Sequence, residues 1–471
     1  MDLLIPAGWC VAYTLLASPV LALVARLVKA RGRWLWLAAL PAFAYAGYSF
    51  GADRLPQKKA SHGKTTPALC KLQFLGMDGL DHAQLQAMGA ELPNFQRLYS
   101  EAAWGSLKTV SRHSPEIWTS VVTGMKPKDH GVSGYTTSWL TGTALELPDD
   151  SRDWLGQFVY ANTNLRTRGA VGSNARRVRA LWELAGDYER SSVFVNWWAS
   201  YPAEPVAGII ISNHAIPWYG FTPELLNHAE PMATWPASEA ASVRAVADQV
   251  VADLGAGKLR RDVQTEEGSR YFLVRDQISW ATGRRLWREK SPDLLAVYVQ
   301  GADTASHAWT FTVFGKEHPD EQRRQVGEAE AEALFERLVR SAYRAMDQRL
   351  GEAMAEGNCI LLVSDHGWRY DGTMHNTKPD GVFFAWGPPF ATGEIPKASI
   401  LDLMPTLLHT LGMPIAKPLP GKVIKAAFKP EHQSLAKEIS SFGPRGDRVA
   451  VHPASDDAEH IEALRALGYV E

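Results

Sequence analysis

The stretch "KLQFLGMDGLD", residues 71–81, decides the fold, because a short apolar run ends abruptly at an acidic residue, Asp78, followed by a glycine. The pattern recurs in "DLLAVYVQGADTASH", residues 293–307, and in "NCILLVSDHGW", residues 358–368. Short apolar runs separated by longer amphipathic stretches predict alternating strands and helices. We therefore expect an α/β fold with a largely parallel sheet sandwiched by helices.

A long helix is predicted from about residue 322 to residue 356, directly before the third strand. Its apolar residues recur at helical spacing, as Leu338, Ala342, Met346 and Leu350 illustrate. A helix in this position fits the crossover that joins two parallel strands.

Acidic and imidazole side chains follow the three predicted strands. In open α/β sheets ligands bind at the carboxyl ends of the strands, so these side chains are expected to converge on one site. They are Asp78, Asp303, His307, Asp365, His366 and, slightly later, His375. Three carboxylates and three imidazoles divide into two sets of three, which predicts two divalent metal ions, zinc or else manganese. Taken singly, each histidine would more simply be a capping, core or surface residue.

The stretch "SRHSPEIWTSVVTGMKPKDHG", residues 111–131, supplies several hydroxyl groups. A hydroxyl bound to such a metal ion can lose its proton near neutral pH, so one of them is a candidate nucleophile. The residues alone leave open which one it is.

Together these motifs resemble the type I phosphodiesterase and nucleotide pyrophosphatase branch of the alkaline phosphatase superfamily. The resemblance covers roughly residues 70–425 and rests on "DGLD" at Asp78, on the TG-x-x-P-x-x-HG pattern within residues 111–131, on "DTASH", "SDHGW" and His375, and on "LDLMPTLLHTLGMP".

The resemblance implies a role for each matching residue. Ser114, directly before Pro115, would be the nucleophile, with Ser111, Thr119 and Ser120 as rival hydroxyls. One metal ion would be held by Asp303, His307 and His375, and the other by Asp78, Asp365 and His366 with Ser114 bound to it. Thr123, Pro127 and His130 would shape the turn.

The chain departs from the family in one respect. Nucleotide pyrophosphatases place an asparagine shortly after the nucleophile to hold a phosphate oxygen, and "PEIW" offers none. His113, Arg112 or a backbone N–H near Ser114 are candidates to replace it. The Cys/Ser-x-Pro-x-Arg pattern of sulfatases is also missing around Ser114.

The N-terminus contains two uncharged runs, between Asp2 and Arg26 and between Arg33 and Asp53. Each is long enough to cross a bilayer as a helix, although a buried core helix pair is an alternative. The loop between them is basic, which predicts that it is cytoplasmic and that the following domain lies outside. We expect an anchor at residues 1–51, a linker at 52–67, a catalytic domain at 68–430 with a helical insertion around 220–290, and a helical tail at 431–471.

The composition indicates which partners the protein is not expected to bind and whether its cysteines form a disulfide. A net charge of −2 and a pI near 6.7 argue against a nucleic acid polymer as partner. Cys70 and Cys359 each lie just before a predicted strand, so a disulfide is one alternative, while unpaired small core residues are the preferred interpretation.

The sequence therefore predicts an inner-membrane phosphodiesterase facing the periplasm, with two divalent metal ions and a phosphoseryl intermediate. Its substrate would be a lipid head group, a nucleotide or a glycan phosphate. A phosphoethanolamine or phosphoglycerol transferase on the same fold, or a non-catalytic membrane-anchored binding protein, are the alternatives.

Overall fold

The computed structural model describes residues 65–140, 146–147, 166–216, 221, 232–258, 266–315, 325–371, 379–434 and 436–446. The predicted anchor, most of the predicted linker and the chain from residue 447 onward lie outside these ranges. None of the described helices is both long and apolar enough to cross a lipid bilayer.

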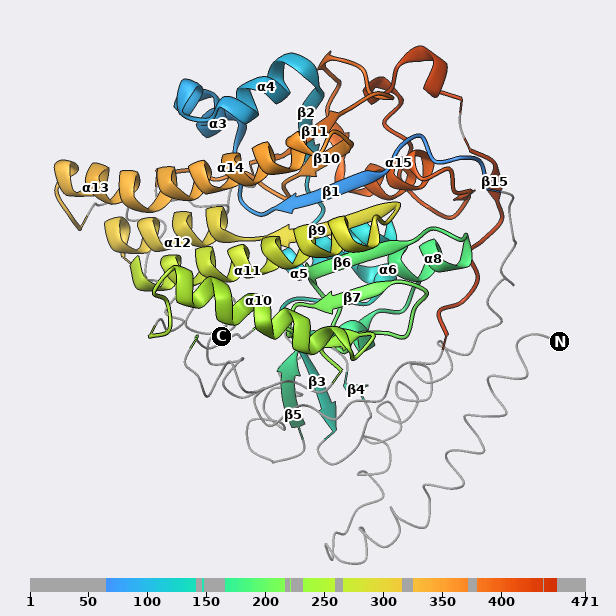
Figure 1. Ribbon diagram of the computed structural model, residues 1–471, viewed down its shortest axis with the longest axis horizontal. Helices are drawn as coiled ribbons and strands as arrows, with labels where there is room; N and C mark the ends of the chain where they lie inside the picture. The colour runs from blue at the N-terminus through green and yellow to red at the C-terminus, as the bar shows by residue number, and fades with distance from the viewer. Residues whose placement is uncertain are drawn as a thin grey trace, which may run out of the picture. The chain divides into compact units, whose positions relative to one another are not determined.

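Three neighbouring strands form the centre of the main sheet (Figure 1). β1 (Leu72–Met77) lies between β9 (Leu294–Val299) and β10 (Cys359–Val363) and is parallel to both. All residues of these strands are buried, as expected for parallel strands covered on both faces. They are the strands predicted from the repeated sequence pattern, and their carboxyl ends lie at one edge.

The sheet is mixed toward its margins, in the order β12-β2-β11-β10-β1-β9-β6-β7-β8. β6 (Ser192–Trp197) and β7 (Ile209–Ser212) continue the parallel arrangement beyond β9. Antiparallel pairs join β10 to β11 (Gly381–Trp386) and β11 to β2 (Ala103–Lys108). The α/β fold is confirmed, and the sheet is mixed: its central strands are parallel, whereas β11 pairs antiparallel with both of its neighbours and β8 pairs antiparallel with β7.

The remaining strands are short or separate. At the margins of the main sheet lie β8 (Thr234–Trp235), β12 (Gly393–Glu394) and β13 (Ala398–Ser399). Two further small sheets comprise β3 (Thr136–Leu140), β4 (Glu146–Leu147) and β5 (Arg166–Ala170), and β14 (Ile415–Ala416) with β15 (Glu438–Ile439).

The described residues also form α-helices. They are α3 (His82–Met88), α4 (Pro93–Glu101), α5 (Ser114–Thr123), α6 (Pro127–His130), α8 (Leu181–Asp187), α10 (Glu239–Asp253), α11 (Glu266–Lys290), α12 (Gly301–Phe314), α13 (Glu328–Phe335), α14 (Ser341–Ala355) and α15 (Leu403–Thr410).

Two contacts with β9 establish which helix covers which face. Gly283 of α11 packs so closely that a Cβ there would lie 2.7 Å from Cγ2 of Val297. Trp118 of α5 packs instead against the next residue of the strand, Tyr298, with ring centroids 5.0 Å apart. Because successive strand residues point to opposite faces, α11 and α5 cover opposite sides of the sheet.

Three predicted helical regions can be compared with the described residues. The predicted helix at 322–356 corresponds to α13, a π-helical turn at Glu336–Arg340 and α14, which run without interruption into the approach to β10. The expected insertion around 220–290 contains α10 and α11, and α11 packs directly on the sheet. The described part of the expected helical tail carries a 3-10 turn at Pro430–His432 and β15.

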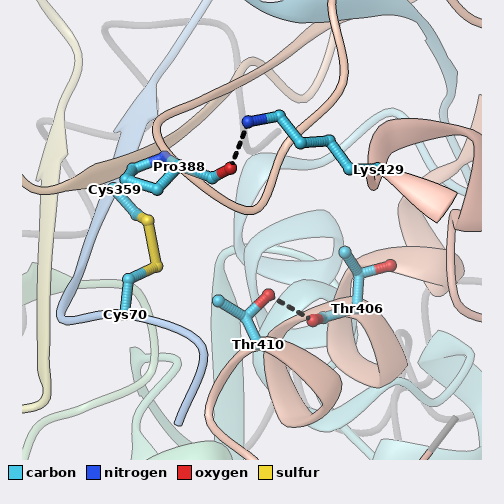
Figure 2. Close-up of a disulfide and its surroundings, with 6 residues drawn as sticks. All are labelled: Cys70, Cys359, Pro388, Thr406, Thr410 and Lys429. Atoms are coloured by element: carbon cyan, nitrogen blue, oxygen red, sulfur yellow. Dashed lines mark hydrogen bonds between the residues drawn. A yellow bond between two sulfur atoms is a disulfide. The ribbon is translucent and has the colours of Figure 1, made fainter. Parts of the chain in front are cut away.

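Cys70 and Cys359 form a disulfide, with their Cα atoms 6.1 Å apart (Figure 2). The preferred interpretation of both as unpaired residues is therefore wrong. The parallel register of β1 and β10 sets Leu72 opposite Cys359 and so brings Cys70, two residues earlier, within reach. Both cysteines lie at the amino ends of their strands, at the end of the sheet away from the predicted site.

Candidate active site

Asp78 directly follows β1, where a tight turn brings the chain against α12. Gly79 has φ +74°, and a Cβ at this position would lie 2.7 Å from the Cα of Asp303. The glycine is therefore needed both for the backbone conformation and for the close approach. The Asp78 N–H also donates to Val299 O at the end of β9 (2.9 Å), which ties the two strand ends together.

The predicted acidic and imidazole side chains meet at this edge of the sheet. One carboxylate oxygen each of Asp78 and Asp303 and one ring nitrogen of His366 lie within 4.8 Å of one another. Nε2 of His366 lies 3.4 Å from Asp78 Oδ1, 3.9 Å from Asp303 Oδ1 and 3.6 Å from Asp365 Oδ2. His307 lies one turn after Asp303 on α12, and its Nε2 is 3.7 Å from Asp303 Oδ2. All five side chains are buried.

Two aromatic side chains fix the carboxylate of Asp78. Its Oδ2 accepts hydrogen bonds from the hydroxyl of Tyr298 (2.5 Å) and from Nε1 of Trp118 (3.2 Å). The other oxygen, Oδ1, is left facing His366. Neither aromatic residue was among the predicted site residues, because each fits a hydrophobic core pattern equally well.

Burial shifts the pKa values of Asp365 and His307. It raises the pKa of the Asp365 carboxyl well above its usual range, and the charge of Asp78 raises it further. Burial also lowers the pKa of His307 to about 3, with a smaller contribution from His366, so the His307 imidazole is neutral. A neutral imidazole is the form that binds metal ions.

These residues fit a divalent cation. The buried carboxyl groups of Asp78 and Asp365 interact with each other, and both face Nε2 of His366. Buried carboxylates are costly unless they are paired or coordinate a metal ion. Asp78, Asp303, His307, Asp365 and His366 could therefore supply ligands, whereas His375 lies outside the described residues.

Ser114 is buried and is the first residue of α5. Pro115 follows it and has no N–H, which suits the first turn of a helix. The amides of Glu116 and Ile117 both donate to His113 O (3.0 and 3.1 Å). The amide of Ser114 instead donates to the hydroxyl of Tyr135 (3.4 Å). Both groups therefore lie at the N-terminus of α5, the positive end of its dipole.

Tyr135 is a site residue that the sequence did not predict. Burial, together with the nearby charges of Asp303 and Asp78, raises the pKa of its hydroxyl well above 10, so it stays a phenol. The preceding residue is held by Glu116, whose Oε1 accepts the Gly134 N–H (2.7 Å) and contacts His113 Nδ1 (3.1 Å). Glu116 thus joins the start of α5 to the segment that carries Tyr135.

Two of the three rival hydroxyls have other partners, whereas Oγ1 of Thr119 is buried without a hydrogen-bond partner among the described residues. Ser111 Oγ bonds to Glu116 Oε2. Ser120 Oγ donates to Glu116 O (2.9 Å) and contacts His130 Nε2 (3.1 Å) inside the helix packing. Thr119 is likewise buried within α5.

The turn residues have contacts that suit their predicted structural role. Nδ1 of His130 accepts the Val132 N–H (3.1 Å), and its Nε2 contacts Glu116 O (3.1 Å). Thr123 Oγ1 donates to Thr119 O (2.7 Å). Pro127 begins α6.

Several solved structures match the chain at low similarity. Phosphonoacetate hydrolase from Sinorhizobium meliloti 1021, in complex with phosphonoformate, shares 15% identity over 68% of this chain and 63% of its own, with a TM-score of 0.35. Phosphonate monoester hydrolase from Silicibacter pomeroyi shares 13% identity over 77% of this chain and 76% of its own, with a TM-score of 0.40. An alkaline phosphatase superfamily protein from Vibrio parahaemolyticus shares 12% identity over 80% and 74%, with a TM-score of 0.37.

The extent of the matches differs between the comparisons. The match spans less than two thirds of the phosphonoacetate hydrolase. The sequence has no match among curated proteins. The family model of type I phosphodiesterase / nucleotide pyrophosphatase matches residues 72–370, which is more than half of the chain and includes β1, α5, β9, α12 and β10. The chain therefore belongs to the type I phosphodiesterase/nucleotide pyrophosphatase family.

Proposed function

We propose that this protein is a metal-dependent phosphodiesterase in which Ser114 is the nucleophile. The observation that carries the proposal is the pairing at the start of α5, where the Ser114 amide donates to the Tyr135 hydroxyl (3.4 Å). That hydroxyl in turn lies close enough to Asp303 and Asp78 for their charges to raise its pKa. A buried serine at a helix N-terminus beside buried carboxylates and imidazoles suits attack on an anionic ester.

We assign two divalent ions, zinc or manganese, to this cluster. Asp303, His307 and His375 would hold one, and Asp78, Asp365, His366 and Ser114 the other. Such ions would stabilise the charge on the attacking and leaving oxygens of an in-line displacement and lower the pKa of the serine hydroxyl.

The protein's own groups then orient the phosphoryl group. The Tyr135 hydroxyl accepts the Ser114 N–H and is itself a donor on the helix side, and a non-bridging phosphoryl oxygen that accepts its hydrogen would be fixed for attack. Tyr135 would thus take the place of the asparagine that the chain lacks. Trp198 packs against Tyr135, with ring centroids 5.8 Å apart, and limits the movement of the phenol ring.

The reaction proceeds in two displacements. Oγ of Ser114 forms a bond to phosphorus and loses its proton, while the bond from phosphorus to the leaving oxygen breaks and that oxygen takes up a proton. A water oxygen then bonds to phosphorus, the phosphoseryl bond breaks, and Ser114 regains a proton. The products are an alcohol and a phosphomonoester.

The N-terminal runs are proposed to anchor the enzyme in the inner membrane, with the catalytic domain in the periplasm. The Cys70–Cys359 disulfide supports an oxidising compartment, because disulfides rarely persist in a reducing cytosol. A membrane location would suit a lipid head group or glycan phosphate as substrate, and a nucleotide is a further candidate. Alkaline phosphatase fused after Thr66 should be active in intact cells, whereas activity of a fused cytoplasmic reporter only would overturn the proposed topology.

The catalytic proposal is tested with the full-length protein in detergent, loaded with zinc or manganese. Hydrolysis of a bis-aryl phosphodiester, an aryl phosphomonoester and an aryl sulfate is compared for the wild type, Ser114→Ala and the matched control Ser120→Ala. We expect metal-dependent diester turnover that Ser114→Ala abolishes and Ser120→Ala retains within a few-fold. Turnover that survives in Ser114→Ala would contradict the assignment of the nucleophile, and a strong preference for the sulfate would contradict the reaction class.

A further inference from the structure

Asp276 of α11 binds the start of α12 from outside that helix. Its side chain is fully buried. Oδ1 accepts the backbone N–H of Gln300 (3.0 Å), and Oδ2 accepts that of Gly301 (2.7 Å). The first amides of a helix have no partner within it, so this carboxylate satisfies two of them.

The fit between Asp276 and α12 is close. A Cβ at Gly301 would lie 2.7 Å from Asp276 Oδ2. The glycine therefore lets the carboxylate approach the helix end directly. In the same turn, the Thr304 amide and Oγ1 both donate to Gln300 O (3.1 Å each).

The turn fixed in this way carries predicted metal ligands. Asp303 is the third residue of α12, and His307 follows one turn later. Rotating or fraying the first turn would move the Asp303 carboxylate away from His366, which lies 3.9 Å from it.

We propose that Asp276 is a positioning residue for the metal site, which holds Asp303 and His307 in place by fixing the first turn of α12. This inference rests on the proposed metal-dependent function. Residues that orient metal ligands without touching the metal ion commonly affect metal affinity by about 10- to 100-fold.

Asp347 of α14 provides a matched control. It is also a buried aspartate that binds the start of another helix, since Oδ1 accepts the Phe95 N–H (2.8 Å) and Oδ2 accepts Asn94 Nδ2 (2.8 Å) at the start of α4. α4 carries none of the predicted site residues. Losing either cap should lower stability, but only the cap of α12 should affect metal binding.

The test uses full-length protein in detergent, stripped of metal with a chelator. Asp276→Asn and Asp347→Asn are compared with the wild type by thermal unfolding without metal, by calorimetric titration with Zn²⁺ and Mn²⁺, and by diester hydrolysis against metal concentration. We expect both variants to melt at a lower temperature. Asp276→Asn alone should bind one of the two ions about 10- to 100-fold more weakly. Its diester turnover should need correspondingly more metal, with an unchanged KM for the diester at saturating metal.

A second variant approaches the same contact from the other side. Gly301→Ala leaves Asp276 in place but introduces a methyl group where the carboxylate lies. We expect Gly301→Ala to weaken binding of the same ion. If Asp276→Asn does not fold, Gly301→Ala is used for the comparison in its place.

Wild-type metal affinity in folded Asp276→Asn and Gly301→Ala would overturn the proposal, and so would an equal loss in Asp347→Asn. If the wild type binds two ions but hydrolyses no ester, the proposed function fails while the affinity comparison still decides the role of Asp276. A wild type that binds no divalent ion would overturn both.

Discussion

Nε2 of His366 lies 3.4 Å from Oδ1 of Asp78, although the two residues follow different strands, β10 and β1. The contact exists because these strands are parallel neighbours whose carboxyl ends coincide. It places an imidazole and a carboxylate, both buried, at the centre of the candidate site.

Replacing His366 with alanine should weaken divalent metal binding by at least about 100-fold and abolish ester hydrolysis, because the side chain contacts three carboxylates at the site. Calorimetric titration with Zn²⁺ or Mn²⁺ measures the loss. His409→Ala is the control, since His409 is also buried but bonds to His432 O (2.7 Å). Equal affinities for the two variants would refute the role of His366.

Tyr298→Phe should loosen the carboxylate of Asp78 by removing one of the two donors to Oδ2. We expect metal affinity to fall about 10-fold and the free energy of unfolding to fall by about 1.5–3 kcal/mol, as for other hydrogen bonds to charged groups. Tyr99→Phe, which loses a contact to His82 Nδ1 (2.6 Å) instead, should leave metal affinity unchanged. Chemical denaturation and metal titration of both variants separate the two effects.

Tyr135→Phe should lower kcat for the diester about 100-fold, because it removes a donor to the phosphoryl oxygen. The acidic and imidazole ligands proposed for the metal ions stay in place, so metal affinity should match the wild type. His113→Ala serves as the comparison, since that side chain is exposed and its ring also packs against Tyr135, with centroids 5.7 Å apart. A kcat for Tyr135→Phe within a few-fold of the wild type would rule out the phenol as a phosphate-binding donor.

Acid should destabilise the protein through His130. Burial lowers the pKa of His130 from about 6.5 to about 4. Its Nδ1 accepts the Val132 N–H, so a proton there would break that hydrogen bond. Between these two pH values the unfolded chain binds the proton more readily, so the free energy of unfolding falls as the pH drops from about 6.5 to 4, by about 3 kcal/mol from this group.

The contribution of His130 is isolated by measuring urea denaturation of the wild type and of His130→Gln across this pH range. The variant should show a flatter pH dependence, although it is less stable at neutral pH. Parallel pH profiles would show that His130 is not the responsible group.

The central strands and the residues at their ends were predictable because each is recognised from a short continuous stretch of sequence. An apolar run followed by Asp78, Asp303 or Asp365 identifies both the strand and its functional end. Strand direction at the margins was not predictable, since antiparallel β11 and parallel β6 have similar apolar runs.

The supporting side chains were missed for a different reason. Trp118, Tyr135 and Tyr298 are aromatic residues in apolar surroundings, and only the tertiary structure shows which hydroxyl or indole N–H faces the site. The pairing of Cys70 with Cys359 likewise depends on strand register. The metal-ligand roles, the membrane anchor and His375 stay predictions.

The disulfide also simplifies site-specific labelling. The chain has three cysteines, and two of them are joined, Cys70 just before β1 and Cys359 at the start of β10. Cys10 is then the sole remaining thiol, so Cys10→Ser would give a full-length chain without a reactive sulfhydryl. A single cysteine introduced at an exposed position near α12 could carry a spin label or fluorophore. The mobility or fluorescence of that probe would report whether metal binding orders the helix.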